Sequence, residues 1–455
     1  MIQTLRNAWK IPELRKKLLF TVFALLIFRL GSAVPVPFVD TEALEVTLNS
    51  MGGIFGLLGA MNGTAFSMAA VFALGVQPYI NSSIIVQLLT VAIPALERLQ
   101  KDGGEDGRKK LAAITRYVTV GIALLQGFGY FSLINYQGLI TPDGAPIWLV
   151  GTIIVLSFTA GSAFVMWLGE QITEFGIGNG ISIILFAGIV SRIPSMLDGM
   201  VTGVKNWANP LTADQAASLG TAAAERYNAA AVHPAIVPLV VIGMLALVIF
   251  IVFISDSERR IPVQYAKRVV GRKMYGGQSS HIPMKVNMSG VMPIIFAQAI
   301  ASLPATIAAF IPGGNESTFM KVFDSNGLLY AVVYFILILG FSYFYSTMQF
   351  NPIEVANNLK KNGGFVPGFR PGKPTADFIF RVLNRITLFG AIYLAIIALL
   401  PIITSNIINA ASASTMGRSL SVGGTSVIIV VGVALETVKA LEAQMLMRHY
   451  KGFLE

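Results

Sequence analysis

Long apolar runs separated by polar connections dominate the pattern of this chain. A transmembrane helix needs about 20 predominantly apolar residues to cross about 30 Å of hydrocarbon. Ten stretches meet this requirement, and an even number of spans places both termini on the same side of a membrane. The predicted spans centre on residues 18–38, 66–94, 111–134, 147–169, 178–196, 235–254, 289–311, 328–348, 379–403 and 422–441.

The composition supports this pattern, because charged residues make up only 12% of the chain and hydrophobic residues 54%. Soluble globular domains carry about 25% charged residues, so a water-soluble body, an intrinsically disordered chain and a disulfide scaffold are excluded. The predicted fold class is an all-α polytopic membrane protein. Cysteine is absent and the three histidines lie far apart in sequence, so we expect no metal site and no cofactor.

The positive charges are distributed unevenly over the connections between spans. The N-terminal segment, the loops 95–116 and 255–288, the segment 349–385 and the tail after 438 together hold 27 of the 33 Lys and Arg residues. Because such residues collect on the cytoplasmic side, these connections and both termini are predicted to be cytoplasmic. The formal net charge of +10 therefore needs no nucleic acid to explain it. The first apolar run could be a cleaved signal peptide, but nine further spans follow it.

Ten spans divide into two sets of five, which suggests an internal duplication. Five is odd, so the second set would enter the membrane with opposite orientation, as an inverted repeat. This inference rests on counting spans and not on similarity between the halves. The predicted divisions are an N-terminal half at 1–197, an external hinge loop at 198–234, a C-terminal half at 235–441 and a cytoplasmic tail at 442–455.

The region before the second span is unusual. Its glycine-rich run is broken by Asn62 and Gly63 after about ten apolar residues, too few to cross the membrane. We predict a short helix that enters from outside and returns. The following helix carries Gln77, Asn81 and Gln87, and polar groups at membrane depth usually face another helix or a cavity. Ordinary hydrogen bonding between helices explains these residues equally well.

Two long cytoplasmic loops, 255–288 and 349–385, mix basic residues with aromatic and turn residues. Long structured loops often bind partners, and basic clusters with tyrosine suit RNA phosphate or acidic protein surfaces. Anionic lipid headgroups are an alternative partner. Neither a nucleotide-binding loop nor a G-x-S-x-G nucleophile motif occurs, so we predict that the protein is not an enzyme.

Several long motifs together resemble the SecY family, whose members form the central subunit of the bacterial protein-translocation channel. The resemblance extends from about residue 15 to residue 445, and the motifs occur in order relative to the predicted spans. They are FRLGSAVPVP at 28–37, FALGVQPYINSSIIVQLLT at 72–90, GEQITEFGIGNGISI at 169–183, the loop elements RRIPVQYAKR and KVNMSGV, NPIEVANNLKKNGGFVPGFRPGKPT at 351–375, and GGTSVIIVV at 423–431.

The resemblance implies an hourglass-shaped channel of two inverted five-helix halves, closed at its waist by aliphatic side chains. The waist positions that match the family's motifs are Val76, Ile80, Ile181, Leu185, Ile295 and Ile429. It also implies a short re-entrant plug helix over about 52–62 that fills the outer funnel at rest. The plug residues are Gly52, Gly53, Ile54, Phe55, Gly56, Leu57, Leu58, Gly59, Ala60, Met61 and Asn62.

The resemblance further implies that the halves part between the second and seventh spans. Asn81, Gln87 and Gln298 are therefore candidates for a polar lateral gate. Residues near the tips of the basic loops match positions that dock the SecA ATPase and the ribosome, including its RNA. These candidates are Arg268, Arg272, Lys273 and Arg370.

The implied function is a passive channel in the bacterial cytoplasmic (inner) membrane that translocates unfolded secretory polypeptides and releases transmembrane segments sideways into lipid. Signal peptides and nascent polypeptides would be its substrates, SecE and SecG its small membrane subunits, and SecA or the ribosome its driving partner. Two alternatives remain open. A secondary transporter also uses inverted repeats and interrupted helices, although no acidic residue lies at the midplane of a predicted span. A membrane scaffold would only recruit a cytosolic machine.

Overall fold

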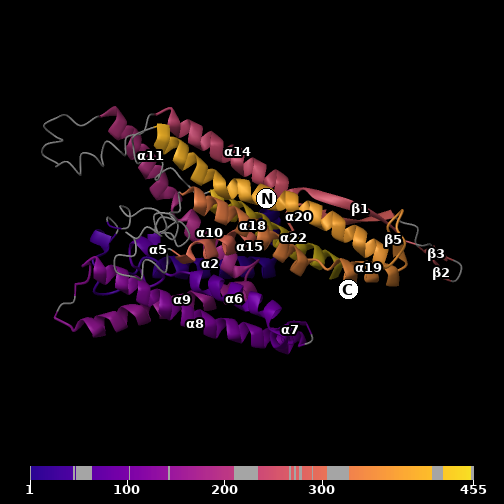
Figure 1. Cartoon of the computed structure of the whole chain (residues 1–455), viewed down its shortest axis with the longest axis horizontal. Coiled ribbons are helices and arrows are strands. Elements are labelled where there is room, and N and C mark those ends of the chain that lie inside the picture. The colour runs from indigo at the N-terminus through magenta and orange to yellow at the C-terminus, as the bar shows by residue number, and fades with distance from the viewer. Residues whose placement is uncertain are drawn as a thin grey trace.

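Helices make up most of the computed structural model of the chain (Figure 1). Most elements that belong to residues before 190 lie on the lower side of the view, and most of those that follow 234 lie on the upper side, whereas the helix Ile193–Ala208 lies at the upper left (Figure 1). The structure describes residues 2–44, 47, 64–101, 103–141, 144–209, 234–265, 268–270, 273–275, 279–288, 290–304, 327–411 and 424–451.

The N-terminal half contains nine described helices. The helices are α1 (Ile2–Lys10), α2 (Pro12–Gly31), α5 (Thr64–Ser67), α6 (Gln77–Ala92), α7 (Pro94–Lys101), α8 (Gly104–Tyr136), α9 (Ile147–Phe175), α10 (Gly180–Val190) and α11 (Ile193–Ala208). The last of these extends into the predicted external hinge loop at 198–234, so the first part of that segment is helical.

The C-terminal half combines long helices with short strands. The helices are α14 (Ile236–Asp256), α15 (Met292–Ala301), α18 (Leu328–Gln349), α19 (Pro352–Lys361), α20 (Lys373–Ala411) and α22 (Gly424–Lys451). The strands are β1 (Glu258–Tyr265), β2 (Arg268–Val270), β3 (Lys273–Tyr275), β4 (Ser279–Lys285) and β5 (Gly364–Phe365).

A described helix overlaps each of the ten predicted spans. Among the described residues, five helices are long and apolar enough to cross a membrane alone, and these lie in α8, α9, α14, α18 and α20. Helices α6 and α7, bent by 106°, would together form a sixth. The apolar helices α10 and α15 are shorter. The helical membrane fold is therefore confirmed, whereas the number of ten spans and their grouping into inverted halves stay predictions.

The two basic loops fold together into a small antiparallel sheet, which the all-helical prediction did not include. Strand β1 lies in the centre, pairing with β4 on one side and with β5 on the other. Alternate residues of β1 face inward, so that Ile261 and Val263 are buried against Leu359 and Ile379. The loops between α14 and α15 and between α18 and α20 thus form one body, at one end of the molecule (Figure 1).

The main hydrophobic core lies between the two halves. Its residues come from α2, α6, α9 and α10 of the N-terminal half and from α14, α15, α18, α20 and α22 of the C-terminal half. The halves meet along two lines, which we call the gate seam, where α6 packs against α15, and the back seam, where α10 and α1 pack against α22. The core between the halves is thus flanked by two separate contacts between them. A channel between the halves would need such an arrangement.

Close packing on α9 fixes the irregular segment that precedes α6. A Cβ atom at Gly161 would lie 2.0 Å from the carbonyl oxygen of Val71, so only glycine allows this approach. The neighbouring Ser162 hydroxyl donates to the carbonyl oxygen of Gly75 at 3.2 Å. Helix α9 therefore determines where the chain enters α6.

We predict that Gly161→Ala lowers the free energy of unfolding by about 1–3 kcal/mol, the usual cost of overpacking a buried contact. Thermal unfolding in detergent micelles measures the effect. Gly121→Ala on α8 is the matched control, because a Cβ atom there would have no neighbour within 4 Å. Equal unfolding temperatures for the two variants would contradict the packing argument.

Candidate functional site

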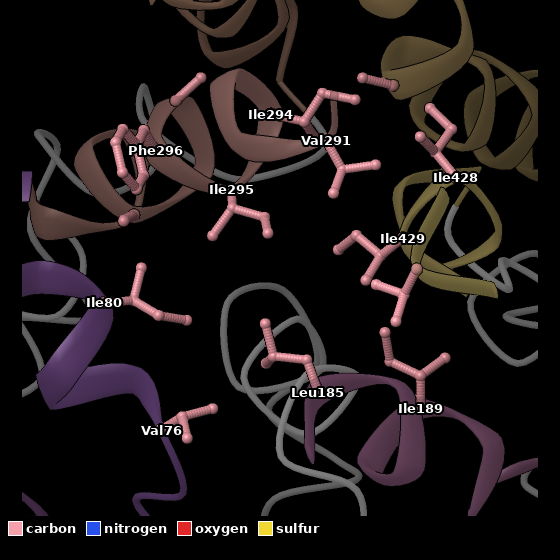
Figure 2. Close-up of a cluster of buried hydrophobic side chains, with 14 of the residues drawn as sticks. Val76, Ile80, Leu185, Ile189, Val291, Ile294, Ile295, Phe296, Ile428 and Ile429 are labelled. Atoms are coloured by element: carbon pink, nitrogen blue, oxygen red, sulfur yellow. The ribbon is translucent and has the colours of Figure 1, made fainter. Parts of the chain in front are cut away.

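The six residues predicted for the channel waist gather at the centre of the core between the halves. Five of them are at most 6% exposed, and Ile181 packs against the same cluster. Figure 2 shows Ile80, Leu185, Ile295 and Ile429 pointing toward one another from four different helices. We call the six residues the aliphatic ring. The structure brings the six together, and their role in a channel stays a prediction.

A glycine turn places the α6 members of the aliphatic ring. Gly75 has φ +52°, a left-handed conformation that residues with a side chain rarely adopt. Val76 follows as the N-cap of α6, and Pro78 occupies the first turn, where its missing N–H costs nothing. Ile80 then lies one turn after Val76, and both side chains point toward the centre of the cluster (Figure 2).

A second glycine turn separates α9 from α10 and places the α10 members of the ring. Gly178 has φ +70°, and the Asn179 side chain then accepts hydrogen bonds from the N–H groups of Ile181 and Ser182 at 3.1 and 3.4 Å. This N-cap fixes the start of α10. Ile181 and Leu185, four residues apart, consequently share one helix face.

Further aliphatic residues belong to the same cluster and were not predicted. Ile189 lies one turn beyond Leu185, and Val291 lies one turn before Ile295; Ile294 and Ile428 adjoin them (Figure 2). Ile189 and Val291 each lie four residues from a predicted ring position, and this i, i+4 spacing was the one signal in the sequence that could have indicated them. The apolar constriction is therefore longer than a single ring.

A cavity of about 440 Å³ borders the aliphatic ring and is lined in part by Ile80, Ile181 and Ile295. Its lining also includes Ser83 and Gln87, which follow Ile80 along α6 toward the basic loop 95–116, so it lies on the predicted cytoplasmic side.

The wall of this cavity is polar away from the aliphatic ring. Arg116 of α8 and Glu170 of α9 line it and form an ion pair in which Arg116 Nε lies 2.9 Å from Glu170 Oε1. The cavity lining thus combines charged and polar side chains with the aliphatic side chains of the ring.

The predicted gate residues lie along the gate seam but differ in their environments. Gln87 accepts a hydrogen bond from the Tyr345 hydroxyl of α18 at 2.6 Å. Gln298 of α15 is 5% exposed, and its Oε1 atom has no hydrogen-bond partner among the described residues. Asn81 is half-buried. Tyr345, which sequence reasoning missed, is a polar contact of the gate seam, and no pattern in the sequence distinguishes it from the other tyrosines of its helix.

The predicted docking residues are only partly described. The backbones of Arg268 and Lys273 lie in the antiparallel pair β2 and β3, and Arg272 lies outside the described residues. Arg370 is exposed, and the Thr375 hydroxyl donates to its carbonyl oxygen at 2.7 Å. The plug residues 52–62 also lie outside the described residues.

Charged pairs elsewhere are peripheral to the aliphatic ring. Lys439 Nζ donates to Asp256 Oδ1 at 2.6 Å, and this bond holds the pKa of the Asp256 carboxyl below its usual range. Both side chains are exposed, so the pair adds little stability. Among the described residues, no three His, Asp or Glu side chains are grouped closely enough to hold a metal ion.

The side chains of the aliphatic ring have the properties of a hydrophobic seal. Aliphatic side chains neither hydrogen-bond nor carry charge, and a narrow constriction lined by them excludes water and ions. The same side chains offer no polar group to retain a peptide. The arrangement can close a passage between the halves without fixing what passes through it.

Comparisons with known proteins agree with this geometry. The SecY family model matches residues 70–438. The protein translocase subunit SecY of Streptomyces coelicolor is 42% identical over 469 aligned residues that cover 100% of both chains. A solved structure described as a protein conducting channel matches with a TM-score of 0.58 at 17% identity, covering 95% of this chain and 92% of the other. Sec61 in the canine ribosome-channel complex matches with a TM-score of 0.55 at 16% identity and the same coverage.

We predict that Gln298→Met stabilises the protein by about 1 kcal/mol, because it removes a buried carbonyl oxygen that has no hydrogen-bond partner among the described residues. Thermal unfolding in detergent micelles measures the change. Gln87→Met should shift the unfolding temperature in the opposite direction, since the Gln87 carbonyl is hydrogen-bonded. A shift of the same sign for both variants would contradict the assignment of these two environments.

Proposed function

The chain belongs to the SecY family of protein translocase subunits, and we propose that it works as a passive channel that conducts unfolded polypeptides through the aliphatic ring. The family assignment makes it a multi-pass membrane protein and a channel subunit. The observation that carries the proposal is the convergence of aliphatic side chains from α6, α10, α15 and α22 on one point between the halves (Figure 2).

Physical properties of the aliphatic ring support this role. A closed apolar constriction dewets, so ions do not cross at rest. A peptide that enters can displace the side chains by rotamer changes, which break no hydrogen bond. A charged lining would instead retain segments of opposite charge. The ring would thus block ions at rest and still let peptides of many different sequences pass.

The gate seam supports sideways release of transmembrane segments, as the second part of the proposal. Its polar side chains, including Gln87 and Gln298, lie where α6 faces α15 and α18. An apolar segment held in this seam would gain about 25 cal/mol for each Å² of apolar surface that it moves from water into lipid. Segments of about 20 apolar residues would therefore leave toward the bilayer.

The remaining parts of the proposal concern partners and orientation. The loops that form the sheet would dock SecA or the ribosome on the cytoplasmic side, and a similarity to Sec61 in a ribosome-channel complex supports the ribosome. Both termini would be cytoplasmic, in the bacterial cytoplasmic membrane. SecE, SecG and anionic lipids would complete the assembly, and residues 52–62 would act as the plug.

We predict that a single cysteine placed at Ile80 or Ile295 forms a disulfide with a cysteine in a secretory polypeptide stalled during translocation. The protein has no natural cysteine, so each adduct reports one position. The proposal requires both sites to touch the passing chain.

Phe128→Cys is the matched control, because this α8 side chain is 62% exposed on the outer surface of the helices. The expected result is adducts at both ring sites and none at 128. Absence of adducts at both ring sites, while the stalled chain is present, would overturn the channel proposal.

We predict that Arg370→Glu reduces the rate of SecA-driven or ribosome-driven translocation at least tenfold. The exposed Arg370 guanidinium projects from a segment fixed by the Thr375 hydrogen bond, and reversing its charge would oppose an acidic or phosphate partner. Translocation into proteoliposomes measures the rate. Arg108→Glu, an exposed residue near the start of α8, is the control and should change the rate little. Equal rates for the two variants would remove the docking role of Arg370.

A further inference from the structure

A basic residue, Arg192, follows the aliphatic cluster along the chain of α10. It is one of the Lys and Arg residues that lie outside the connections predicted to be cytoplasmic, so the collection of positive charge on the cytoplasmic side does not explain it. Helix α10 ends at Val190, and α11 begins at Ile193. Arg192 therefore lies in the short link between the two helices, where it is half-buried.

The backbone of this link places Arg192 directly beyond Ile189. The Arg192 N–H donates to the Ile189 carbonyl oxygen at 3.1 Å, which is a tight turn in which residues three positions apart lie one above the other. Ser191 and Arg192 both keep right-handed helical backbone angles. Arg192 also follows Ile181 by eleven residues, which is three helical turns to within about 20°. The residue thus continues the line of Ile181, Leu185 and Ile189.

This line is the face of α10 that meets the opposite half. Ile189 is 9% exposed and belongs to the same cluster as Leu185 and Ile429 (Figure 2). At about 1.5 Å per residue, the backbone of Arg192 lies about 5 Å farther along the helix axis than that of Ile189. A chain that leaves the apolar constriction on this side therefore passes within reach of the long Arg192 side chain.

Charges of opposite sign lie at the two ends of the constriction. The cavity beside the start of α10 is lined by Glu170, which pairs with Arg116, and by Glu174, which adds a further carboxylate. This cavity lies on the predicted cytoplasmic side. Arg192 lies at the opposite end of α10, where the chain continues toward the predicted external segment 198–234. A translocating segment would thus leave the carboxylates, cross the aliphatic side chains and then meet a cation.

The other charged residues of α11 lie away from this line. Asp198 follows Arg192 by six residues and Lys205 follows it by thirteen. At 100° per residue, both positions are turned about 120° or more from the direction of Arg192. Both residues are exposed. Among the charged residues of this link and of α11, Arg192 therefore lies nearest to the end of the constriction.

From this placement we propose that Arg192 selects by charge among the segments that leave the aliphatic ring, so that acidic segments leave faster than basic ones. The inference rests on the proposed channel function. Apolar walls concentrate the field of a nearby charge, and a charge beside the constriction acts on each residue that passes. Exposed ion pairs in proteins have energies that correspond to about twofold to fivefold in an equilibrium constant. We expect an effect of this size on the rate of passage.

Translocation of three matched substrates tests the proposal. Each substrate is the same secretory polypeptide with a short block of Lys, Asp or Gln at one position, and SecA drives it into proteoliposomes without a membrane potential. The measured quantity is the translocation rate of the Asp substrate divided by that of the Lys substrate, which we call the charge ratio. We expect Arg192→Gln to lower the charge ratio about twofold to fivefold and to leave the rate of the Gln substrate unchanged.

Two further variants separate the charge of Arg192 from its place in the structure. Arg192→Lys keeps the positive charge and should keep the charge ratio of the unmodified protein. Arg192→Glu reverses the charge and should lower the charge ratio below that of Arg192→Gln. Added salt should reduce these differences, because it screens the charge. A role confined to holding the link between α10 and α11 would slow all three substrates alike and leave the charge ratio unchanged.

Lys205→Gln is the matched control. It removes one positive charge from α11, the helix that follows the link, about 20 Å farther along the chain. At that distance an exposed charge is largely screened at physiological salt. The charge ratio should therefore equal that of the unmodified protein.

Three outcomes would overturn the selection by Arg192: an unchanged charge ratio in Arg192→Gln, an equal change in Lys205→Gln, or a charge ratio in Arg192→Lys that matches that of Arg192→Gln. Failure of the proposed function has a different result. If the unmodified protein did not translocate even the Gln substrate, and cysteines at positions 80 and 295 formed no adduct with it, the channel itself would be wrong. If the Gln substrate crossed and the charge ratio did not respond to Arg192→Gln, only the selection by charge would be wrong.

Discussion

Contact between aliphatic side chains of two separate helix groups is the interaction on which the whole structure depends. The contact is non-directional, so it can be broken and formed again without any atom returning to a fixed partner. Ile80 and Leu185 approach from one half, and Ile295 and Ile429 from the other (Figure 2). Among the described residues, no main-chain hydrogen bond joins α6 or α10 to α15 or α22. The strength of the seal therefore depends on how rigidly each half holds its own helices.

Hydrogen bonds inside each half hold its helices in fixed positions. In the N-terminal half, the carbonyl oxygen of Gly75 is bonded to Ser162, and Asn179 caps α10. In the C-terminal half, the Ser346 and Thr387 hydroxyls share a hydrogen bond of 2.7 Å between α18 and α20. Rigid bodies joined by a deformable apolar contact allow one opening motion while the helices themselves stay intact.

The sequence predicted the features that belong to long continuous motifs. It did not predict the features that depend on contacts between segments far apart in the chain. The ring positions Val76 and Ile80 and the polar residue Gln87 were named from the motif at 72–90. The sheet was not visible, since β1 pairs with β5, about 100 residues later, and no local pattern records that partner. Tyr345 was missed for the same reason, because its significance is its distance from Gln87 in space.

Buried polar atoms without hydrogen-bond partners among the described residues oppose the packing between the halves. Gln77 Oε1 on α6, Gln298 Oε1 on α15 and Ser342 Oγ on α18 lack hydrogen-bond partners among the described residues. All three helices contribute to the core between the halves, and each unsatisfied atom raises the free energy of the closed state. The aliphatic contact and the Tyr345–Gln87 bond act in the opposite direction. Under the proposed function, the difference between these opposing terms determines how readily the two halves part.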